Sequence, residues 1–210
     1  MLKMHWGCSR DSGGIIINGG IILTSIYFVR HAQPSSEWED DRTNPLSKLG
    51  LDDSKRVTQI LENAEIDIFY SSPFKRSMDT ILDCANHYNM IIHTDERLRE
   101  RKMGIKSFDF LEQRWDDFNF CEDEGESIAS VQQRNMEALD EILNKHPDKN
   151  IVIGTHGTAL STILNFYDPL FGYDEFRRIH FSMPYIIRLD FDGDKLVKTT
   201  ELLKIDRGYE

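Results

Sequence analysis

Residues 26–33 read Ile-Tyr-Phe-Val-Arg-His-Ala-Gln, and this stretch decides the fold of the chain. Four residues that favour strands are followed without a spacer by Arg30 and His31, so a buried strand ends on two polar side chains. In open α/β sheets, binding crevices lie outside the carboxyl ends of the strands. The stretch therefore predicts a strand over 24–30 with Arg30 and His31 at the edge of a binding site.

The composition is that of a globular protein with a core. The chain has 210 residues, 40% hydrophobic and 29% charged, with a formal net charge of −11. This acidic balance argues against a nucleic-acid partner, because phosphate backbones would be repelled over most of the surface. No apolar run approaches the roughly 20 residues of a membrane-spanning helix, so we expect no membrane partner. Cys8, Cys84 and Cys121 are widely spaced, which favours a reducing, cytoplasmic location.

From residue 24 onward, strand and helix patterns alternate. Apolar runs predict strands over 24–30, 66–70, 90–93 and 151–155, and a hairpin over 185–191 and 196–203 with its turn at 192–193. Between them, helices are predicted over 47–61, from about 73 to 88, 127–145 and up to 166, with a short one over 108–118. The first helix has a predicted apolar stripe of Leu51, Val57, Ile60 and Leu61. This alternation predicts a three-layer α/β/α sandwich with a mainly parallel central sheet.

The first 23 residues differ from the rest. Two isoleucine-rich clusters are separated by Asn18-Gly19, which is a hairpin signal, although a secretory signal is an alternative. We interpret residues 1–23 as a weakly packed extension, which a start site placed too early would explain. Residues 24–210 are then a single domain.

Four charged positions follow predicted strands or tight turns: Arg30-His31, Arg76, Glu100 and His156. If the strands are parallel, all of them lie at the same edge of the sheet. Two arginines and two histidines facing one crevice would suit a doubly charged phosphoryl group, because arginine forms bidentate hydrogen bonds with phosphate.

These residues occur in six short motifs in a fixed order. They are Val29–Ala32, Asn44–Gly50, Ser71–Arg76, Leu98–Glu100, Gly125–Ser127 and Gly154–Gly157. In this order the chain resembles the histidine phosphatase superfamily, also called phosphoglycerate mutase-like, in its branch of short bacterial phosphatases.

The resemblance implies a role for each matched residue. His31 is the nucleophile that becomes phosphohistidine, while Arg30, Arg76 and His156 hold the phosphoryl oxygens. Glu100 protonates the leaving oxygen and then activates the water that releases phosphate. This chemistry requires neither a metal nor a cofactor, and its substrate is a small phosphorylated metabolite.

The chain departs from the family pattern just after His31. The usual sequence Arg-His-Gly-Glu is replaced by Arg-His-Ala-Gln, ending at Gln33. Many members have an asparagine ligand of phosphate six residues after the nucleophile, where this chain has Glu37. We expect Glu37 to point away from the dianion or its loop to shift. The segment after Glu100 also lacks the basic clamp of the true mutases, which favours hydrolysis.

Several alternatives stay open at this point. A mutase, or a non-catalytic protein that binds phosphorylated ligands, is an alternative function. Glu96 is a second candidate acid, and Arg42 and Lys75 are candidate secondary anion contacts. The other histidines, including His180, are interpreted as structural. Some of five aromatic residues are expected to form an apolar wall over the crevice: Phe108, Phe110, Trp115, Phe118 and Phe120.

Overall fold

The computed structural model describes residues 23–37 and 39–207. Its strands are β1 (Thr24–Arg30), β2 (Ile68–Ser71), β3 (Ile92–Thr94), β4 (Asn150–Thr155), β5 (Ser182–Asp192) and β6 (Lys195–Asp206). Its α-helices are α1 (Lys48–Leu61), α2 (Lys75–His87), α3 (Leu111–Asp116), α4 (Ile128–Lys145), α5 (Gly157–Tyr167) and α6 (Tyr173–His180). Two 3₁₀ turns, η1 (Glu96–Leu98) and η2 (Ser107–Phe110), complete the elements. The hairpin predicted before residue 23 lies outside the described residues.

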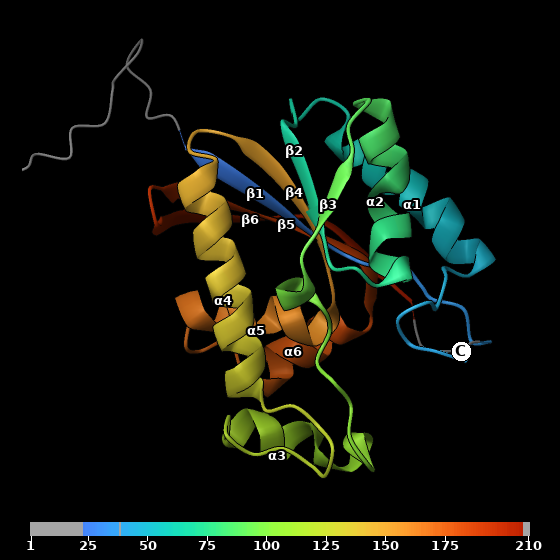
Figure 1. The fold of residues 1–210 in the computed structure, drawn as a ribbon, viewed down its shortest axis with the longest axis vertical. Helices are drawn as coiled ribbons and strands as arrows, with labels where there is room; N and C mark the ends of the chain where they lie inside the picture. The colour runs from blue at the N-terminus through green and yellow to red at the C-terminus, as the bar shows by residue number, and fades with distance from the viewer. Residues whose placement is uncertain (1–22, 38, 208–210) are drawn as a thin grey trace, which may run out of the picture.

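The six strands form one sheet in the order β3-β2-β4-β1-β5-β6. Strands β1 to β4 are mutually parallel, whereas β5 runs antiparallel to β1 and β6 antiparallel to β5. Helices α1 and α2 cover one face, and α4, α5 and α6 lie on the other (Figure 1). The predicted three-layer sandwich with a mainly parallel sheet is therefore confirmed.

Alternate residues of β1 enter two separate cores, because successive side chains of a strand point to opposite faces. Ile26 and Phe28 pack with α4, α5 and α6, whereas Tyr27 and Val29 pack with α1 and α2. All four are at most 5% exposed. Both faces of β1 are thus buried, which is why its sequence reads as a continuous apolar run.

The predicted stripe of α1 was half wrong. Val57 and Leu61 are buried, but Leu51 and Ile60 are 50% and 43% exposed. The face that packs on the sheet is completed by smaller or polar residues, including Asp53, which forms an ion pair with Arg207 at 3.0 Å. Ser47 caps α1 and Ser127 caps α4, each accepting a backbone N–H three residues on.

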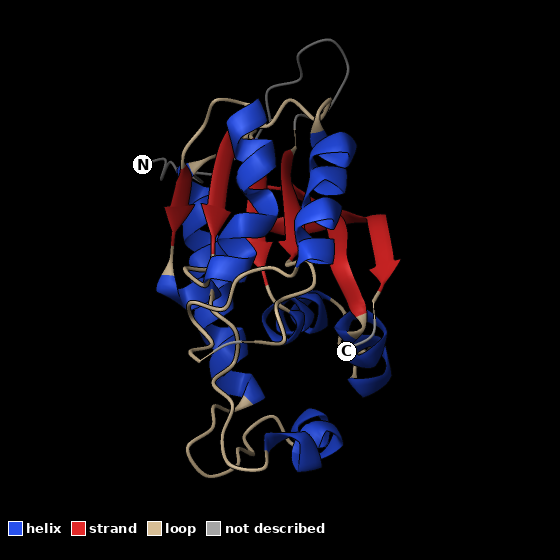
Figure 2. Ribbon diagram, turned by 90° about the vertical axis from the view of Figure 1, so that its right-hand side faces the viewer, coloured by secondary structure: helices blue, strands red, loops and turns tan. Residues whose placement is uncertain are grey.

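The site lies at one edge of the sheet. The four parallel strands end there, and the antiparallel strand β5 begins there, since Arg30 at the end of β1 pairs with Tyr185 near the start of β5. Helix α6, which leads into β5, is therefore brought to the same edge (Figure 2). None of the helices in the described part of the chain is long and apolar enough to cross a membrane.

Candidate active site

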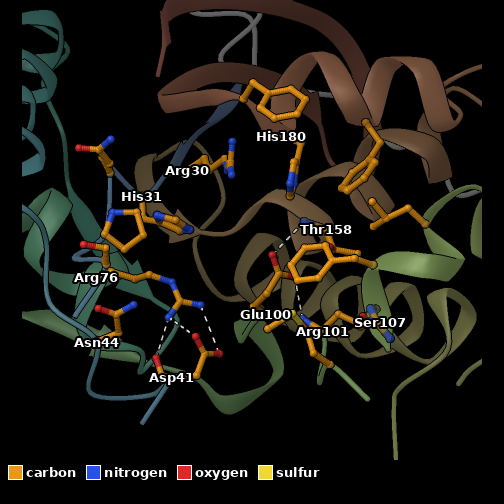
Figure 3. A pocket seen from close by; sticks show the side chains of 18 of the residues that line it. Arg30, His31, Asp41, Asn44, Arg76, Glu100, Arg101, Ser107, Thr158 and His180 are labelled. Carbon is orange, nitrogen blue, oxygen red and sulfur yellow. Dashed lines mark hydrogen bonds and ion pairs between the residues drawn. The ribbon is translucent and has the colours of Figure 1, made fainter. Parts of the chain in front are cut away.

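A cavity of about 920 Å³ opens at this edge of the sheet. Four of the five predicted site residues line it: Arg30, His31, Arg76 and Glu100. They come from the end of β1, the loop after it, the first turn of α2 and the loop after η1. The fifth, His156, is fully buried directly behind His31, with the two ring centroids 5.2 Å apart. The structure thus brings together all five residues from distant parts of the sequence, and Figure 3 labels the four that line the cavity.

His31 is held with one ring nitrogen available for chemistry. Its Nδ1 lies 2.8 Å from the carbonyl oxygen of Ala32. A carbonyl only accepts hydrogen bonds, so the ring proton is on Nδ1 and the lone pair is on Nε2. Burial, followed by the charges of Arg76 and Arg30, lowers the pKa of His31 well below 6.5. The imidazole is therefore neutral at pH 7, as a nucleophile must be.

His156 caps the start of α5 and is buried among polar partners. Its Nε2 lies 2.8 Å from the hydroxyl oxygen of Ser72, while its Nδ1 is buried without a hydrogen-bond partner in the described part of the chain. Ser72 already accepts the backbone N–H of Phe74, so its own O–H can donate to Nε2. In the tautomer in which Ser72 donates to Nε2, the ring proton of His156 is on Nδ1. Burial and the charge of Arg76 lower the pKa of His156 well below 6.5.

The two arginines are oriented by protein oxygens. Arg30 is 1% exposed and donates through Nη1 to the carbonyl oxygens of Ile179 and Ser182, the latter at 2.9 Å. Arg76 donates through Nη1 to the backbone and carboxylate oxygens of Asp41, at 2.6 and 2.8 Å (Figure 3). A third, longer bond of 3.5 Å runs from Nη2 to the other carboxylate oxygen, so Asp41 engages both terminal nitrogens of Arg76, and an anion bound by Arg76 would compete with this carboxylate.

Glu100 accepts three backbone N–H groups. One carboxylate oxygen accepts from Arg101 at 2.7 Å and Ala159 at 3.2 Å, and the other from Thr158 at 3.0 Å. The last two donors are in the first turn of α5, where helical N–H groups lack partners within the helix. The side chain is thereby fixed on the wall of the cavity opposite Arg76 (Figure 3).

A network of charged residues positions the backbone that carries Glu100. Arg134 of α4 donates to the carbonyl oxygens of Arg97, Arg99 and Glu100, at 2.6 to 3.2 Å. Glu126 joins Arg99 and Arg134 through ion pairs of 2.7 and 2.8 Å. Burial alone would raise the pKa of Glu126, but the hydrogen bonds from Arg134 and Arg99 lower it to about 2.

Three secondary candidates lie outside the cavity. Arg42 pairs with Glu96 on the surface, and Lys75 pairs with Asp79 at 2.7 Å. Because none of the three lines this cavity, the structure gives no support to Arg42 and Lys75 as secondary anion contacts or to Glu96 as the fallback acid.

The loop after His31 also lines the cavity. Glu37 is exposed and is among the residues that line the cavity, so the expectation that it points away from the dianion or that its loop shifts stays a prediction. Gln33 lines the cavity as well, and its side-chain oxygen accepts a hydrogen bond from the Ser47 hydroxyl at 2.9 Å.

Sequence reasoning missed α6 as part of the site. His180, interpreted as structural, lines the cavity between Arg30 and Glu100 (Figure 3). Burial and the charge of Arg30 lower the pKa of His180 to about 4, so its ring is neutral at pH 7. Of the five aromatic candidates for an apolar wall, Phe108 lines the cavity, while Trp115 and Phe118 pack in the core. The sequence signal that could have identified His180 is a histidine at the end of a helix that precedes an antiparallel strand.

Comparison with known proteins places these features in context. A family model described as histidine phosphatase superfamily (branch 1) matches residues 26–201. Phosphoserine phosphatase 1 of Hydrogenobacter thermophilus is 29% identical over 170 residues, covering 72% of this chain and 78% of the relative. A probable phosphoglycerate mutase of Yersinia pestis is 27% identical over 185 residues, covering 80% and 86%.

Solved structures share the fold. Mycobacterial glucosyl-3-phosphoglycerate phosphatase superposes with a TM-score of 0.70 at 17% identity, covering 85% of this chain and 97% of its own. A phosphoserine phosphatase of Entamoeba histolytica, solved in complex with phosphoserine, gives a TM-score of 0.69 at 21% identity, covering 85% and 96%.

Proposed function

Because the chain belongs to the histidine phosphatase superfamily, branch 1, we propose that it hydrolyses phosphate monoesters through a phosphohistidine intermediate on His31. One observation carries the proposal: Nε2 of His31 carries no proton, so its lone pair is available in a cavity that Arg30, Arg76 and Glu100 also line. Curated and structural relatives include phosphatases for phosphoserine and for glucosyl-3-phosphoglycerate, which supports the same reaction class.

In the first half of the reaction, Nε2 of His31 attacks phosphorus and the bond from phosphorus to the ester oxygen breaks. Arg30, Arg76 and Nδ1–H of His156 hold the three phosphoryl oxygens, so that charge developing in the transition state meets fixed donors. The leaving oxygen takes a proton from Glu100, which becomes a carboxylate.

In the second half, the Glu100 carboxylate removes a proton from water, and the resulting hydroxide attacks phosphorus. The bond from phosphorus to Nε2 breaks, inorganic phosphate leaves, and both His31 and Glu100 return to their starting forms. The same carboxyl group therefore acts first as acid and then as base.

A direct test measures phosphate release from an aryl phosphate in the presence of a chelator. We expect turnover that the chelator leaves unchanged, and a loss of at least 10³-fold on replacing His31 by alanine, in the range seen for removal of a nucleophile. His93→Ala is the matched control, because this exposed histidine on β3 lies outside the cavity. Full activity of His31→Ala would refute the proposal.

A mutase is the second candidate, favoured by the relative from Yersinia pestis. It requires the phosphoryl group to be returned to the product rather than to water. Supplying 3-phosphoglycerate with labelled phosphorus separates the two activities: a hydrolase releases labelled inorganic phosphate, whereas a mutase retains the label in an isomeric ester. A cytoplasmic location remains a prediction from the cysteines.

A further inference from the structure

The cavity is much larger than the phosphoryl group that His31 would attack. A phosphoryl group occupies about two or three times the 30 Å³ of a water molecule, roughly 60–90 Å³. Most of the 920 Å³ is therefore available to the alcohol part of the ester. The residues around this remaining space determine which esters fit.

The wall facing this space is mostly apolar and comes from two segments. Met103, Phe108 and Leu111 belong to the stretch from the Glu100 loop to α3, and Tyr173, Phe176 and Phe181 belong to α6 and the residue after it. Phe108, Met103 and Phe181 are 69%, 48% and 43% exposed. Large apolar side chains gathered at one cavity mouth are typical of a binding surface.

This wall is supported from behind rather than loosely attached. Phe176 is 3% exposed and packs on Trp115 of α3, with ring centroids 5.3 Å apart. Beneath the wall, Arg101 and Arg114 share the carboxylate of Glu122, at 2.7 and 3.0 Å. Their side chains are only 3% and 4% exposed, so they present little charge to a substrate. Three exposed charged residues also line the cavity, Glu37, Lys48 and Arg177, and the guanidinium of Arg177 lies over the ring of Tyr173, 5.8 Å from its centroid.

We infer that the preferred substrates are phosphate monoesters whose alcohol part is an extended apolar group, either an alkyl chain or an aromatic ring. This inference rests on the proposed hydrolase function. It separates the chain from its phosphoserine phosphatase relative, whose name indicates a small, charged substrate.

The test measures kcat/KM for ethyl, butyl, hexyl and octyl phosphate, beside phosphoserine and 3-phosphoglycerate. The leaving alcohols of the alkyl series have nearly the same acidity, so changes along the series report binding of the chain. We expect a rise of about two- to fourfold per methylene until the wall is covered, since burying one methylene contributes about 0.8 kcal/mol, equivalent to fourfold. Hexyl phosphate should exceed phosphoserine by at least tenfold.

Phe108→Ser should flatten the dependence on chain length. The matched control is Phe166→Ser on α5, which also replaces an exposed phenylalanine, 53% exposed, but outside the cavity. Phe166→Ser should retain the wild-type increase of kcat/KM with chain length. A flat series or a preference for phosphoserine, measured on active enzyme, would overturn the substrate inference alone. If the enzyme hydrolyses none of the six esters, both the hydrolase function and this inference are rejected.

A separate observation concerns Asn44, whose amide is buried without a partner. The residue is 4% exposed and lines the cavity beside Arg76 (Figure 3). Its Oδ1 is buried without a hydrogen bond, and its Nδ2 forms none within residues 23–37 and 39–207. The acceptor Oδ1 offers nothing to an anion, but Nδ2 has no partner in the described residues and is the amide atom that a ligand in the cavity can use.

We propose that Asn44 donates an amide N–H to a phosphoryl oxygen. Glu37, on the same loop, is a carboxylate and cannot donate to an anion, whereas the Asn44 amide can donate and lies next to Arg76.

Thermal unfolding with and without vanadate, a phosphate analogue, tests this role. Asn44→Ala should unfold at the wild-type temperature or above without ligand, because no hydrogen bond is lost. It should bind vanadate about tenfold more weakly, and Asn44→Asp weaker still because its charge repels the anion. Asn135→Ala on α4 is the control: it loses a bond from Nδ2 to Val131 of 2.9 Å, so its stability should fall while its vanadate affinity is retained. Wild-type vanadate affinity in Asn44→Ala would overturn the proposal.

Discussion

Replacing Glu122 by glutamine removes the only carboxylate that contacts both Arg101 and Arg114 in the described structure. The Glu122 side chain is 1% exposed, and both arginines are almost as buried. Burial alone would raise the pKa of Glu122, but hydrogen bonds from Arg101 and from the backbone N–H of Gly104 outweigh it and hold that pKa below its usual range. The carboxylate is therefore charged at pH 7, and the variant leaves two buried cations uncompensated.

The expected loss of stability follows from these contacts. Removing one partner of a buried ion pair costs about 3–5 kcal/mol, and glutamine retains part of the hydrogen bonding, so we expect about 3 kcal/mol. For a chain of this size each kcal/mol lowers the melting temperature by about 2–4 °C, which predicts a fall of roughly 6–12 °C.

Scanning calorimetry and urea unfolding measure this loss. Glu124→Gln, two residues away on the surface, is the matched control and should change stability by less than about 0.5 kcal/mol. Adding Arg114→Met to Glu122→Gln should recover at least about 1 kcal/mol, because it removes one of the uncompensated cations. If Glu122→Gln melts at the same temperature as the Glu124→Gln control, the buried cluster of Arg101, Arg114 and Glu122 does not stabilise the wall of the cavity.

Two further predictions concern protonation and backbone packing. The pKa values of His31 and His156 are lowered below 6.5 in the folded protein, so the contribution of these histidines to stability is complete above pH 6.5 and is lost as the pH falls toward the folded pKa values. Urea unfolding should therefore give a lower free energy of unfolding at pH 5.5 than at pH 8.0. The decrease should be smaller in His156→Asn. Gly50→Ala would place a Cβ 2.2 Å from the backbone oxygen of Gln33, so we expect the melting temperature to fall by several degrees and kcat/KM to decrease. The control Gly172→Ala, whose Cβ would have no neighbour nearer than 4.0 Å, should retain the wild-type melting temperature and kcat/KM. Equal behaviour of the two variants would contradict this packing.

The parts of the site that could be predicted from the sequence are those at the ends of parallel strands. Arg30, His31 and His156 each follow a short apolar run, and parallel pairing places such positions at a common edge. Arg76 and Glu100 were located in the same way, as charged positions after predicted strands or tight turns, and the order of the motifs then implied their roles. Local sequence therefore identified the chemical groups and, through strand direction, their meeting point.

The remaining features depend on contacts that no local pattern encodes. His180 reaches the cavity only because β5 pairs antiparallel to β1, which brings the end of α6 beside Arg30. The exposure of Leu51 follows from which face of α1 meets the sheet. The pairing of Asp41 with Arg76 requires a loop of the chain to fold over the start of α2.

The central claim is that His31 becomes covalently phosphorylated through Nε2. The most direct measurement mixes enzyme with a rapidly cleaved aryl phosphate, stops the reaction in alkali, where phosphohistidine survives, and locates the phosphoryl group by mass spectrometry and phosphorus NMR. The account predicts one phosphoryl group, on Nε2 of His31, that forms and disappears at rates matching turnover and is absent from His31→Ala. A phosphoryl group on another residue, or turnover by wild-type enzyme with none on His31, would contradict it.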